Sequence, residues 1–323
     1  MRVVSVRAYG GPDVLELRHE PDPVAGDGEV LIDVEVADVL LLDARLRSGW
    51  GRQWFDLRPP YVPGAAVAGR VGPEGRRVVA HTGSSGGYAT RVAVPSTHVV
   101  PIPDGVSTQD AAALATDGVT ATALSDLVAV RPGERVLITA AAGGMGVLLV
   151  QLMLAAGAEV VGAVRGDRKL ALVRGLGAEA VDYSAADWAD RARAAVGVES
   201  SADGGPAPAG FDVVLDGVGG SIGQAAFELV VDGGRMSAHG AADPEVAPVD
   251  PAAAARRGVR LTGMETVQFE PARRSELIGR VLAEAAAGRV RPVIGRTFPL
   301  ADAAMAHKEV ENRTVAGKTL LLV

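Results

Sequence analysis

Six consecutive small or flexible residues near the middle of the chain could bind a phosphate group. They fill the frame G-x-G-x-x-G with alanine in its first position, and they are Ala141, Ala142, Gly143, Gly144, Met145 and Gly146. Without bulky side chains, the backbone N–H groups of such a turn can approach a pyrophosphate, and the positive end of a following helix can face its charge. The alternative is an ordinary tight turn between a strand and a helix.

The segments that flank this turn favour the phosphate site. Val136–Ala140 is an apolar run that predicts a buried strand, residues 147–154 repeat apolar side chains at helical spacing, and Glu159–Val164 predicts a second strand. A strand, a tight turn, a helix and a strand form the βαβ unit that binds dinucleotides.

The composition narrows the classes of protein that remain. The chain has 323 residues, of which 48% are hydrophobic, and this suits two domains with substantial cores. No apolar run approaches the roughly 20 residues of a membrane span, and the N-terminus lacks the apolar core of a signal peptide. The net charge of −7 gives no basic surface for nucleic acid, and the absence of cysteine excludes disulfides and thiolate zinc sites. We therefore expect a soluble, cytoplasmic protein with a small-molecule ligand, without nucleic-acid or membrane partners.

The order of the predicted elements indicates an α/β fold in two domains. Strands and helices alternate over residues 119–267, which predicts a doubly wound parallel sheet with right-handed crossovers. The β-rich residues 1–118 and 268–323 should form one discontinuous domain, because the final segment is too small to fold alone. The ligand cleft is expected between the two domains, at the carboxyl ends of the parallel strands.

Within the alternating region, the pattern predicts a helix over 219–231 followed by a strand over 234–239. Residues 199–210, ESSADGGPAPAG, are low in complexity and predict a surface loop.

Seven motifs spread over the whole chain resemble one known superfamily. They are YGGPDVLEL at 9–17, DARLRSG at 43–49, PPYVPGAAVAG at 59–69, GGYAT at 86–90, PIPDGVSTQDAAAL at 101–114, AAAGGMG at 140–146 and LGAEAVDYS at 176–184. The chain resembles the medium-chain dehydrogenase/reductase superfamily and, within it, the zinc-independent quinone oxidoreductase branch. The resemblance implies a GroES-like catalytic domain, a Rossmann nucleotide-binding domain, and hydride transfer from a nicotinamide to a carbon–carbon double bond conjugated to a carbonyl.

The same resemblance implies that no metal takes part. Zinc-dependent relatives carry a cysteine where this chain has Leu40, and a His-Glu pair where it has Ala65 and Ala66. A catalytic zinc ion needs three protein ligands of the Cys, His or carboxylate type, and these positions offer none.

The end of the second strand of the βαβ unit favours NADPH over NADH. NAD enzymes usually place an acid there for the ribose 2′-hydroxyl, whereas this strand ends in Val164 and Arg165. The family's NADPH-dependent members bind the 2′-phosphate with a lysine, a tyrosine and a C-terminal arginine, which match Lys169, Tyr183 and Arg313 here. Cations suit a dianionic phosphate. The alternative is a solvated basic helix start beside a half-buried tyrosine.

The nicotinamide half of the cofactor should lie against the ends of the later strands. The residues expected there, through backbone groups more than side chains, are Asp216, Val218, His239, Gly240 and Met264. Thr120 lies where the resemblance implies a threonine beside the nicotinamide, and it is also a candidate for catalysis.

The group that stabilises and protonates the enolate is the least determined part of the site. Quinone reductase relatives often carry an asparagine at the position of Leu40, and enoyl reductases a tyrosine near Trp50. The remaining candidates are Tyr61, His81, Asp117 and Asp38. Each has a structural alternative: core packing for the tyrosine, a hydrogen-bonded role for the histidine, and a turn or helix cap for the aspartates. Solvent could also supply the proton.

Apolar and aromatic residues gather near the expected cleft and favour a bulky or aromatic substrate, including polyketide-type intermediates. The substrate pocket is assigned to Leu40, Trp50, Trp54 and Phe55. A catalytically silent nucleotide-binding protein on the same fold is the alternative, and a different redox reaction is a third, weaker one. Relatives pair through the last Rossmann strand, here Val259–Gly263, so the resemblance also implies a homodimer.

Overall fold

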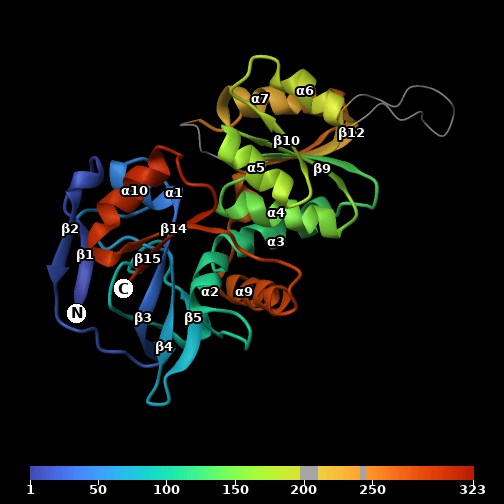
Figure 1. Ribbon diagram of the computed structural model, residues 1–323. Helices are drawn as coiled ribbons and strands as arrows, with labels where there is room; N and C mark the ends of the chain where they lie inside the picture. Colours follow the sequence, from blue (N-terminus) through green and yellow to red (C-terminus); the bar gives the residue numbers. More distant parts are fainter. Residues whose placement is uncertain (197–209, 241–244) are drawn as a thin grey trace. The chain divides into compact units, whose positions relative to one another are not determined.

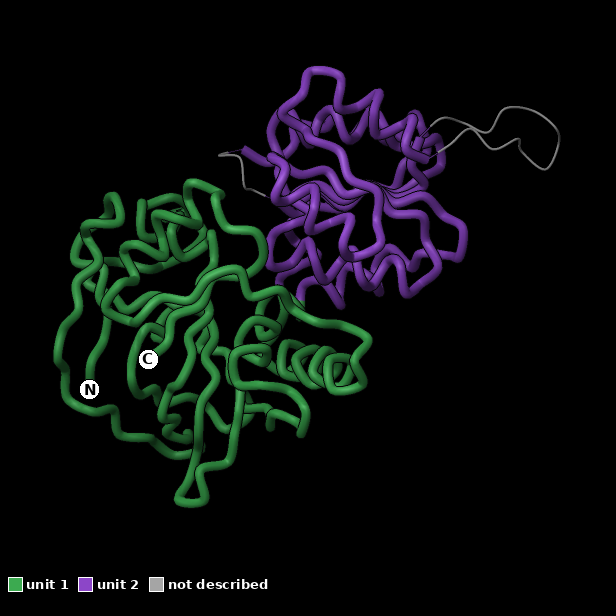
Figure 2. The backbone as a smooth tube through the Cα atoms, in the orientation of Figure 1, with its two compact units in different colours: residues 1–119, 269–323 green, residues 120–268 purple. Residues whose placement is uncertain are grey.

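The chain folds into two compact units. The computed structural model describes residues 1–196, 210–240 and 245–323. Unit 1 contains residues 1–119 and 269–323, and unit 2 contains residues 120–268 (Figure 2). Apart from Gly210, the segment for which a surface loop is expected lies outside the described residues.

Unit 2 is built on a six-stranded sheet in which every pair of neighbouring strands is parallel. The strand order is β10-β9-β8-β11-β12-β13, so the chain winds outward from β8 in both directions. The strands are β8 Arg135–Thr139, β9 Glu159–Val164, β10 Glu179–Asp182, β11 Phe211–Asp216, β12 Val230–Ala238 and β13 Arg260–Thr262. This is the doubly wound Rossmann arrangement that the alternation predicts.

Helices cover both faces of this sheet. Figure 1 shows α3, α4 and α5 on one face and α6 and α7 on the other. Their bounds are α3 Asp117–Val128, α4 Gly144–Ala155, α5 Asp167–Gly175, α6 Trp188–Ala195 and α7 Gly220–Glu228, with α8 Pro251–Arg256 and a 3-10 turn at Met264–Val267 before the end of the unit. Because both faces are buried, the central strands are apolar throughout rather than alternating.

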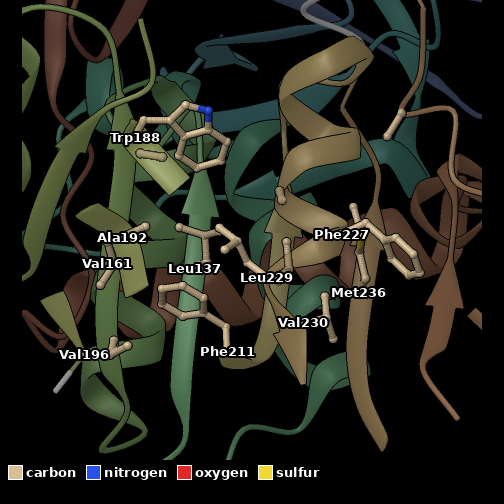
Figure 3. Close-up of a cluster of buried hydrophobic side chains, with 14 of the residues drawn as sticks. Leu137, Val161, Trp188, Ala192, Val196, Phe211, Phe227, Leu229, Val230 and Met236 are labelled. Carbon is tan, nitrogen blue, oxygen red and sulfur yellow. The ribbon is translucent and has the colours of Figure 1, made fainter. Parts of the chain in front are cut away.

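The core on the α6 and α7 face fixes these helices to the strands. Trp188 of α6 and Phe227 of α7 belong to one buried cluster with Leu137 and Phe211 of the sheet, and Phe227 lies beside Met236 of β12 (Figure 3). These residues expose 5% of their surface or less. Burial on this scale contributes roughly 2 kcal/mol for each large side chain.

The helix predicted over 219–231 is wrong at its carboxyl end. Helix α7 ends at Glu228, and β12 begins two residues later, at Val230. Val230 pairs with Phe211 of β11, and the Phe211 N–H donates to the Leu229 carbonyl at 2.8 Å. Val230 and Val231 therefore belong to the sheet, although their apolar character also fits the last turn of a helix.

Unit 1 holds a seven-stranded sheet and a separate two-stranded sheet. The larger sheet runs β14-β15-β3-β4-β5-β7 with β6 also paired to β3, and its pairs are antiparallel except β14 with β15. The strands are β1 Arg2–Val6, β2 Leu15–His19, β3 Glu29–Val39, β4 Ala66–Val71, β5 Arg76–His81, β6 Arg91–Pro95, β7 Val99–Pro101, β14 Ile294–Pro299 and β15 Lys318–Leu322. Since β15 pairs with β3, the last strand of the chain is an inner strand of the sheet that the N-terminal residues build.

Four helices complete unit 1. They are α1 Leu41–Ser48, α2 Thr108–Leu114, α9 Pro271–Ala286 and α10 Ala303–Glu311, with 3-10 turns at Pro12–Val14, Ser96–His98 and Leu300–Asp302. Helix α2 starts at a Ser107 cap, whose hydroxyl accepts from the Asp110 N–H at 3.0 Å. Among the described residues, no helix combines the length and the apolar character needed to cross a membrane.

Candidate functional site

The turn between β8 and α4 is closed by a glycine that no other residue can replace. A Cβ on Gly146 would lie 2.2 Å from the Ala140 carbonyl oxygen and 2.7 Å from the Ala141 Cα. Both are backbone atoms, so neither can move aside. Gly146 therefore sets the close packing of the first turn of α4 against the end of β8.

The amino end of α4 presents bare backbone. Gly143 is the N-cap and has no side chain to accept from the first-turn N–H groups, and the first turn carries no acidic residue. These N–H groups have no partner inside the helix. Gly144 and Met145 supply two of them beside the Gly143 cap, so an anion can take the place of a capping side chain.

Ala141 stands at the first glycine of the frame without obstructing the turn. Its side chain is fully buried, and a Cβ added to Gly162 of β9 would lie 2.8 Å from the Ala141 Cβ. The methyl group therefore fills space left by Gly162 within the protein. Ala142 is equally buried at 1% exposure, and Ala140 takes a left-handed φ of 54° to make the bend.

The ends of β9 and β10 bring three predicted cofactor residues together. Val164 pairs with Asp182 in the sheet register, so Arg165 and Tyr183 both follow directly after paired residues. Lys169 lies in the first turn of α5, which starts at Asp167 after the N-cap Gly166. This places two cations and a phenol at one edge of the sheet.

Asp182 holds the backbone at this edge of the sheet through hydrogen bonds. Its carboxylate accepts from the Gly166 N–H at 3.0 Å and from the Ser184 N–H and hydroxyl at 2.8 and 2.6 Å. Burial raises the pKa of Asp182, but these hydrogen bonds and the charge of Arg165 outweigh it, so the net shift is downward. Arg313 lies in unit 1, after α10, with a left-handed φ of 55°. Its part in this group stays a prediction.

Asp216 holds the turn after β11 rather than offering a free carboxylate. One of its oxygens accepts from the Thr139 hydroxyl at 2.6 Å and from the Val218 N–H at 3.0 Å, and the Gly219 N–H reaches the other at 3.1 Å. Thr139 in turn accepts from the Gly217 N–H at 2.9 Å. Burial raises the pKa of Asp216, and these hydrogen bonds oppose the rise.

The end of β12 lies tightly against the end of β11. A Cβ on Gly240 would fall 2.0 Å from the Gly217 carbonyl carbon, and the Gly240 N–H donates to the Asp216 carbonyl at 2.9 Å. His239, one residue earlier, is 6% exposed. Thr120 in α3 and Met264 after β13 are half-buried members of the same unit.

Two of the predicted proton donors share one buried lysine in unit 1. The Lys318 ammonium lies 2.5 Å from an Asp38 oxygen and 2.9 Å from an Asp117 oxygen. Burial raises the pKa of Asp38, and the lysine opposes the shift. Burial lowers the pKa of Lys318, but the two carboxylates outweigh it and raise the net value. This geometry ties β3, β15 and the start of α3 together.

The other two candidates, His81 and Tyr61, differ in whether their side chains already have polar partners. His81 is 3% exposed, stacks on the His98 ring at 3.8 Å between centroids, and lies 3.5 Å from the Ser275 hydroxyl. Burial lowers its pKa to about 4, so it is neutral at pH 7. Tyr61 is half-buried, and its hydroxyl has no hydrogen-bond partner among the described residues. Burial raises the pKa of Tyr61, so its proton is retained.

Comparison with known proteins identifies the family to which this fold belongs. The model of a family described as zinc-binding dehydrogenase matches residues 176–321. A quinone oxidoreductase of Mus musculus is 30% identical over 100% of this chain and 98% of its own length. A 2-haloacrylate reductase of a Burkholderia species is 30% identical over 98% and 97% of the two chains. The structure of the quinone oxidoreductase from Thermus thermophilus, also solved in complex with NADPH, is 34% identical, covers both chains fully and superposes with a TM-score of 0.83.

The chain belongs to the quinone oxidoreductase family. This confirms the family, within the medium-chain dehydrogenase/reductase superfamily, that the seven motifs indicate.

The family model that matches is described as zinc-binding, but the described residues of this chain offer no group of metal ligands. Over residues 1–196, 210–240 and 245–323, no three His, Cys, Asp or Glu side chains gather closely enough to hold a metal ion. Leu40, at the position of a zinc-binding cysteine in other relatives, is a buried apolar residue.

The residues assigned to the substrate pocket form an aromatic cluster around α1. The Trp50 and Trp54 rings are 5.5 Å apart, and the Arg45 guanidinium lies 5.3 Å from the Trp50 ring. Trp54 is 67% exposed. Phe55 is half-buried against Gly51.

Sequence reasoning missed a buried polar network at the start of α1. The Asp43 carboxylate accepts from the Leu40 N–H at 2.9 Å and from the Tyr88 hydroxyl at 3.2 Å, and that hydroxyl lies 3.0 Å from His307 Nε2. Burial raises the pKa of Asp43 to about 6. The motifs DARLRSG and GGYAT, which contain Asp43 and Tyr88, are the signal that could have identified it.

Proposed function

We propose that this protein is an NADPH-dependent reductase that transfers hydride to a carbon–carbon double bond conjugated to a carbonyl, as in an enone, an enoyl thioester or a quinone. The observation that carries the proposal is the bare amino end of α4, together with a neighbouring strand edge at which Arg165 and Lys169 supply two cations. The family relatives support it through a quinone oxidoreductase solved with NADPH and a 2-haloacrylate reductase.

The bound cofactor would supply the hydride, and unit 2 offers residues for each of its parts. The first-turn N–H groups of α4 would bind the pyrophosphate. Arg165, Lys169 and Tyr183 would bind the 2′-phosphate, because guanidinium, ammonium and phenol groups all donate to its oxygens.

The residues of unit 1 suggest how the developing enolate is stabilised. Asp38 and Asp117 are held by Lys318, and neutral His81 stacks on His98. Tyr61 keeps its proton and has no hydrogen-bond partner in the described part of the chain. We assign to it the hydrogen bond to the enolate oxygen, and to solvent the proton that reaches the α-carbon.

The substrate we propose is bulky and planar. Trp50, Trp54 and Phe55 offer aromatic faces rather than a small closed pocket. Aromatic rings stack on one another and contribute about 1 kcal/mol for each pair beyond burial. A polyketide-type aromatic enone or quinone fits this surface better than a small aldehyde.

The test is the oxidation of NADPH, and of NADH in parallel, against quinones, enones, 2-haloacrylate and enoyl thioesters. We expect turnover with NADPH and at least one planar acceptor, with NADH much weaker. Binding of NADPH without turnover on any acceptor would instead support the silent nucleotide-binding protein, which the apolar Leu40 favours because the family's asparagine is absent there.

We also propose a homodimer that forms along β13. This strand is the last of its sheet, so one of its edges is left without a strand partner within the described residues. A second β13 related by a two-fold axis could continue the sheet. Light scattering after gel filtration should give twice the chain mass of 33.0 kDa, and a monomeric mass would overturn the assignment.

A further inference from the structure

His239 is a buried side chain with one nitrogen left unpaired. Its Nδ1 lies 3.1 Å from the Ser237 hydroxyl, which fixes the orientation of the ring. Its Nε2 has no hydrogen-bond partner among the described residues, and water cannot supply one freely because the side chain is only 6% exposed. A buried polar atom without a partner destabilises the folded protein, and this cost is removed if a ligand provides the partner.

The unpaired nitrogen faces the carboxyl ends of the central strands. A Cβ placed on Gly217 would lie 3.8 Å from His239 Nε2 and 3.4 Å from the Ala140 Cβ. Gly217 follows β11, and Ala140 begins the glycine turn after β8. Nε2 therefore lies near the carboxyl ends of β8 and β11, beside Gly217, which carries no side chain over the strand ends.

The strand order determines which half of a dinucleotide would reach His239. The cationic group marks the adenosine side at β9 and β10, and the glycine turn marks the pyrophosphate at β8. The remaining half must cross β11 toward β12. With neighbouring strands about 4.8 Å apart, β12 lies roughly 10 Å from β8, which is the reach of a ribose and a nicotinamide ring.

We infer that His239 Nε2 binds the carboxamide of the nicotinamide and thereby positions the ring. A carboxamide has an N–H₂ donor and a carbonyl acceptor, so it can pair with either tautomer of a neutral imidazole. Burial lowers the pKa of His239 to about 4, and the ring is therefore neutral at pH 7. A neutral partner does not repel the cationic ring of the oxidised cofactor. This inference rests on the proposed function.

The experiment compares two ligands by calorimetry at pH 7.5: NADPH, and 2′-phospho-ADP-ribose, which lacks only the nicotinamide. In His239→Phe, we expect the Kd for NADPH to rise about ten-fold, while the Kd for 2′-phospho-ADP-ribose stays within about two-fold. His239→Gln, whose amide can still pair, should recover most of the NADPH affinity.

The control variant is Ser237→Ala, which loses the contact that orients the ring but keeps Nε2. It should weaken NADPH binding less than His239→Phe. Equal losses for both ligands in His239→Phe would show a structural role and overturn the inference, as would an unchanged Kd for NADPH. If the unaltered protein binds 2′-phospho-ADP-ribose but gains nothing from the nicotinamide, the inference fails alone. If it binds neither ligand, the proposed function fails with it.

Discussion

The glycine turn can close because Gly146 carries a hydrogen atom where every other residue carries a Cβ. The clash of a Cβ would be with the Ala140 carbonyl oxygen, and backbone cannot rotate away as a side chain can. At Gly143, three residues earlier, a Cβ would lie at an ordinary 3.4 Å from the same oxygen. These two glycines therefore form a matched pair for experiment.

We expect Gly146→Ala to destabilise the protein by about 2 kcal/mol and to raise the Kd for NADPH at least ten-fold, because the first turn of α4 must move. Gly143→Ala should leave stability within about 0.5 kcal/mol. Urea unfolding and calorimetry measure the two quantities. Equal stability of the two variants would contradict the packing described for this turn.

We propose that Arg165 and Lys169 determine the preference for NADPH over NADH. The double variant Arg165→Ala/Lys169→Ala should raise the Kd for NADPH by about ten-fold or more and leave the Kd for NADH unchanged, because only NADPH carries the 2′-phosphate. Arg168→Ala removes an exposed charge from the same helix and is the control. A similar loss for both cofactors would remove the assignment of this edge to the 2′-phosphate.

At the scale of elements, Lys318 joins three segments that are far apart in the sequence. It begins β15, and its two carboxylate partners lie on β3 and at the start of α3. Without the ammonium, the fully buried Asp38 and the partly exposed Asp117 would lose this opposite charge. An ion pair of this kind is costly to break from one side.

Lys318→Met should therefore reduce the free energy of unfolding by about 3–5 kcal/mol. The double variant Asp38→Asn/Lys318→Met should recover part of the loss, because one uncompensated carboxylate is removed. Lys308→Met, at an exposed position of α10, should change stability by less than about 0.5 kcal/mol. Denaturant titration distinguishes these outcomes, and a full-size loss at Lys308 would show that the effect is not one of burial.

The elements themselves were predictable to different degrees. The βαβ unit follows from the apolar pattern, because a strand, a helix and a second strand carry consistent signals in succession over residues 136–164. Helices α1 and α8 have only 8 and 6 residues, too few for a periodic signal, and the start of β12 was assigned to a helix. The network of Asp43, Tyr88 and His307 was not predictable from periodicity, since its members are brought together only by the tertiary fold.

At the scale of the whole molecule, buried neutral histidines make stability depend on pH. Burial lowers the pKa of His81, His239 and His307 to about 4, 4 and 3, below the usual value of about 6.5. Between these values the unfolded chain binds protons that the folded chain does not. The contribution of these histidines therefore lowers the stability as the pH falls from about 6.5 toward 4. Asp38 and Asp43, whose pKa values burial raises to about 7 and about 6, and Asp216, whose pKa burial also raises, act in the opposite direction.

We expect each of these histidines to reduce stability by about 2 kcal/mol at pH 5 relative to pH 7. His307→Phe should lose the contact with Tyr88 at every pH, yet its melting temperature should depend less on pH between 7 and 5 than that of the unaltered protein. Thermal melts across this range measure the two slopes. Parallel curves would contradict a buried, neutral His307.

Because the Ala141 methyl group packs against Gly162 of β9, the shape of the turn depends on the residue types at both positions. A Cβ at residue 162 would lie 2.7 Å from the Val173 Cγ1 of α5 and 2.8 Å from the Ala141 Cβ, so these two side chains fill the space beside Gly162. Restoring the usual glycine at residue 141 would leave a void the size of the Ala141 methyl group, and adding a methyl group at 162 alone would create a collision. A designer who grafts this loop into another scaffold must therefore transfer its neighbour on the adjoining strand as well.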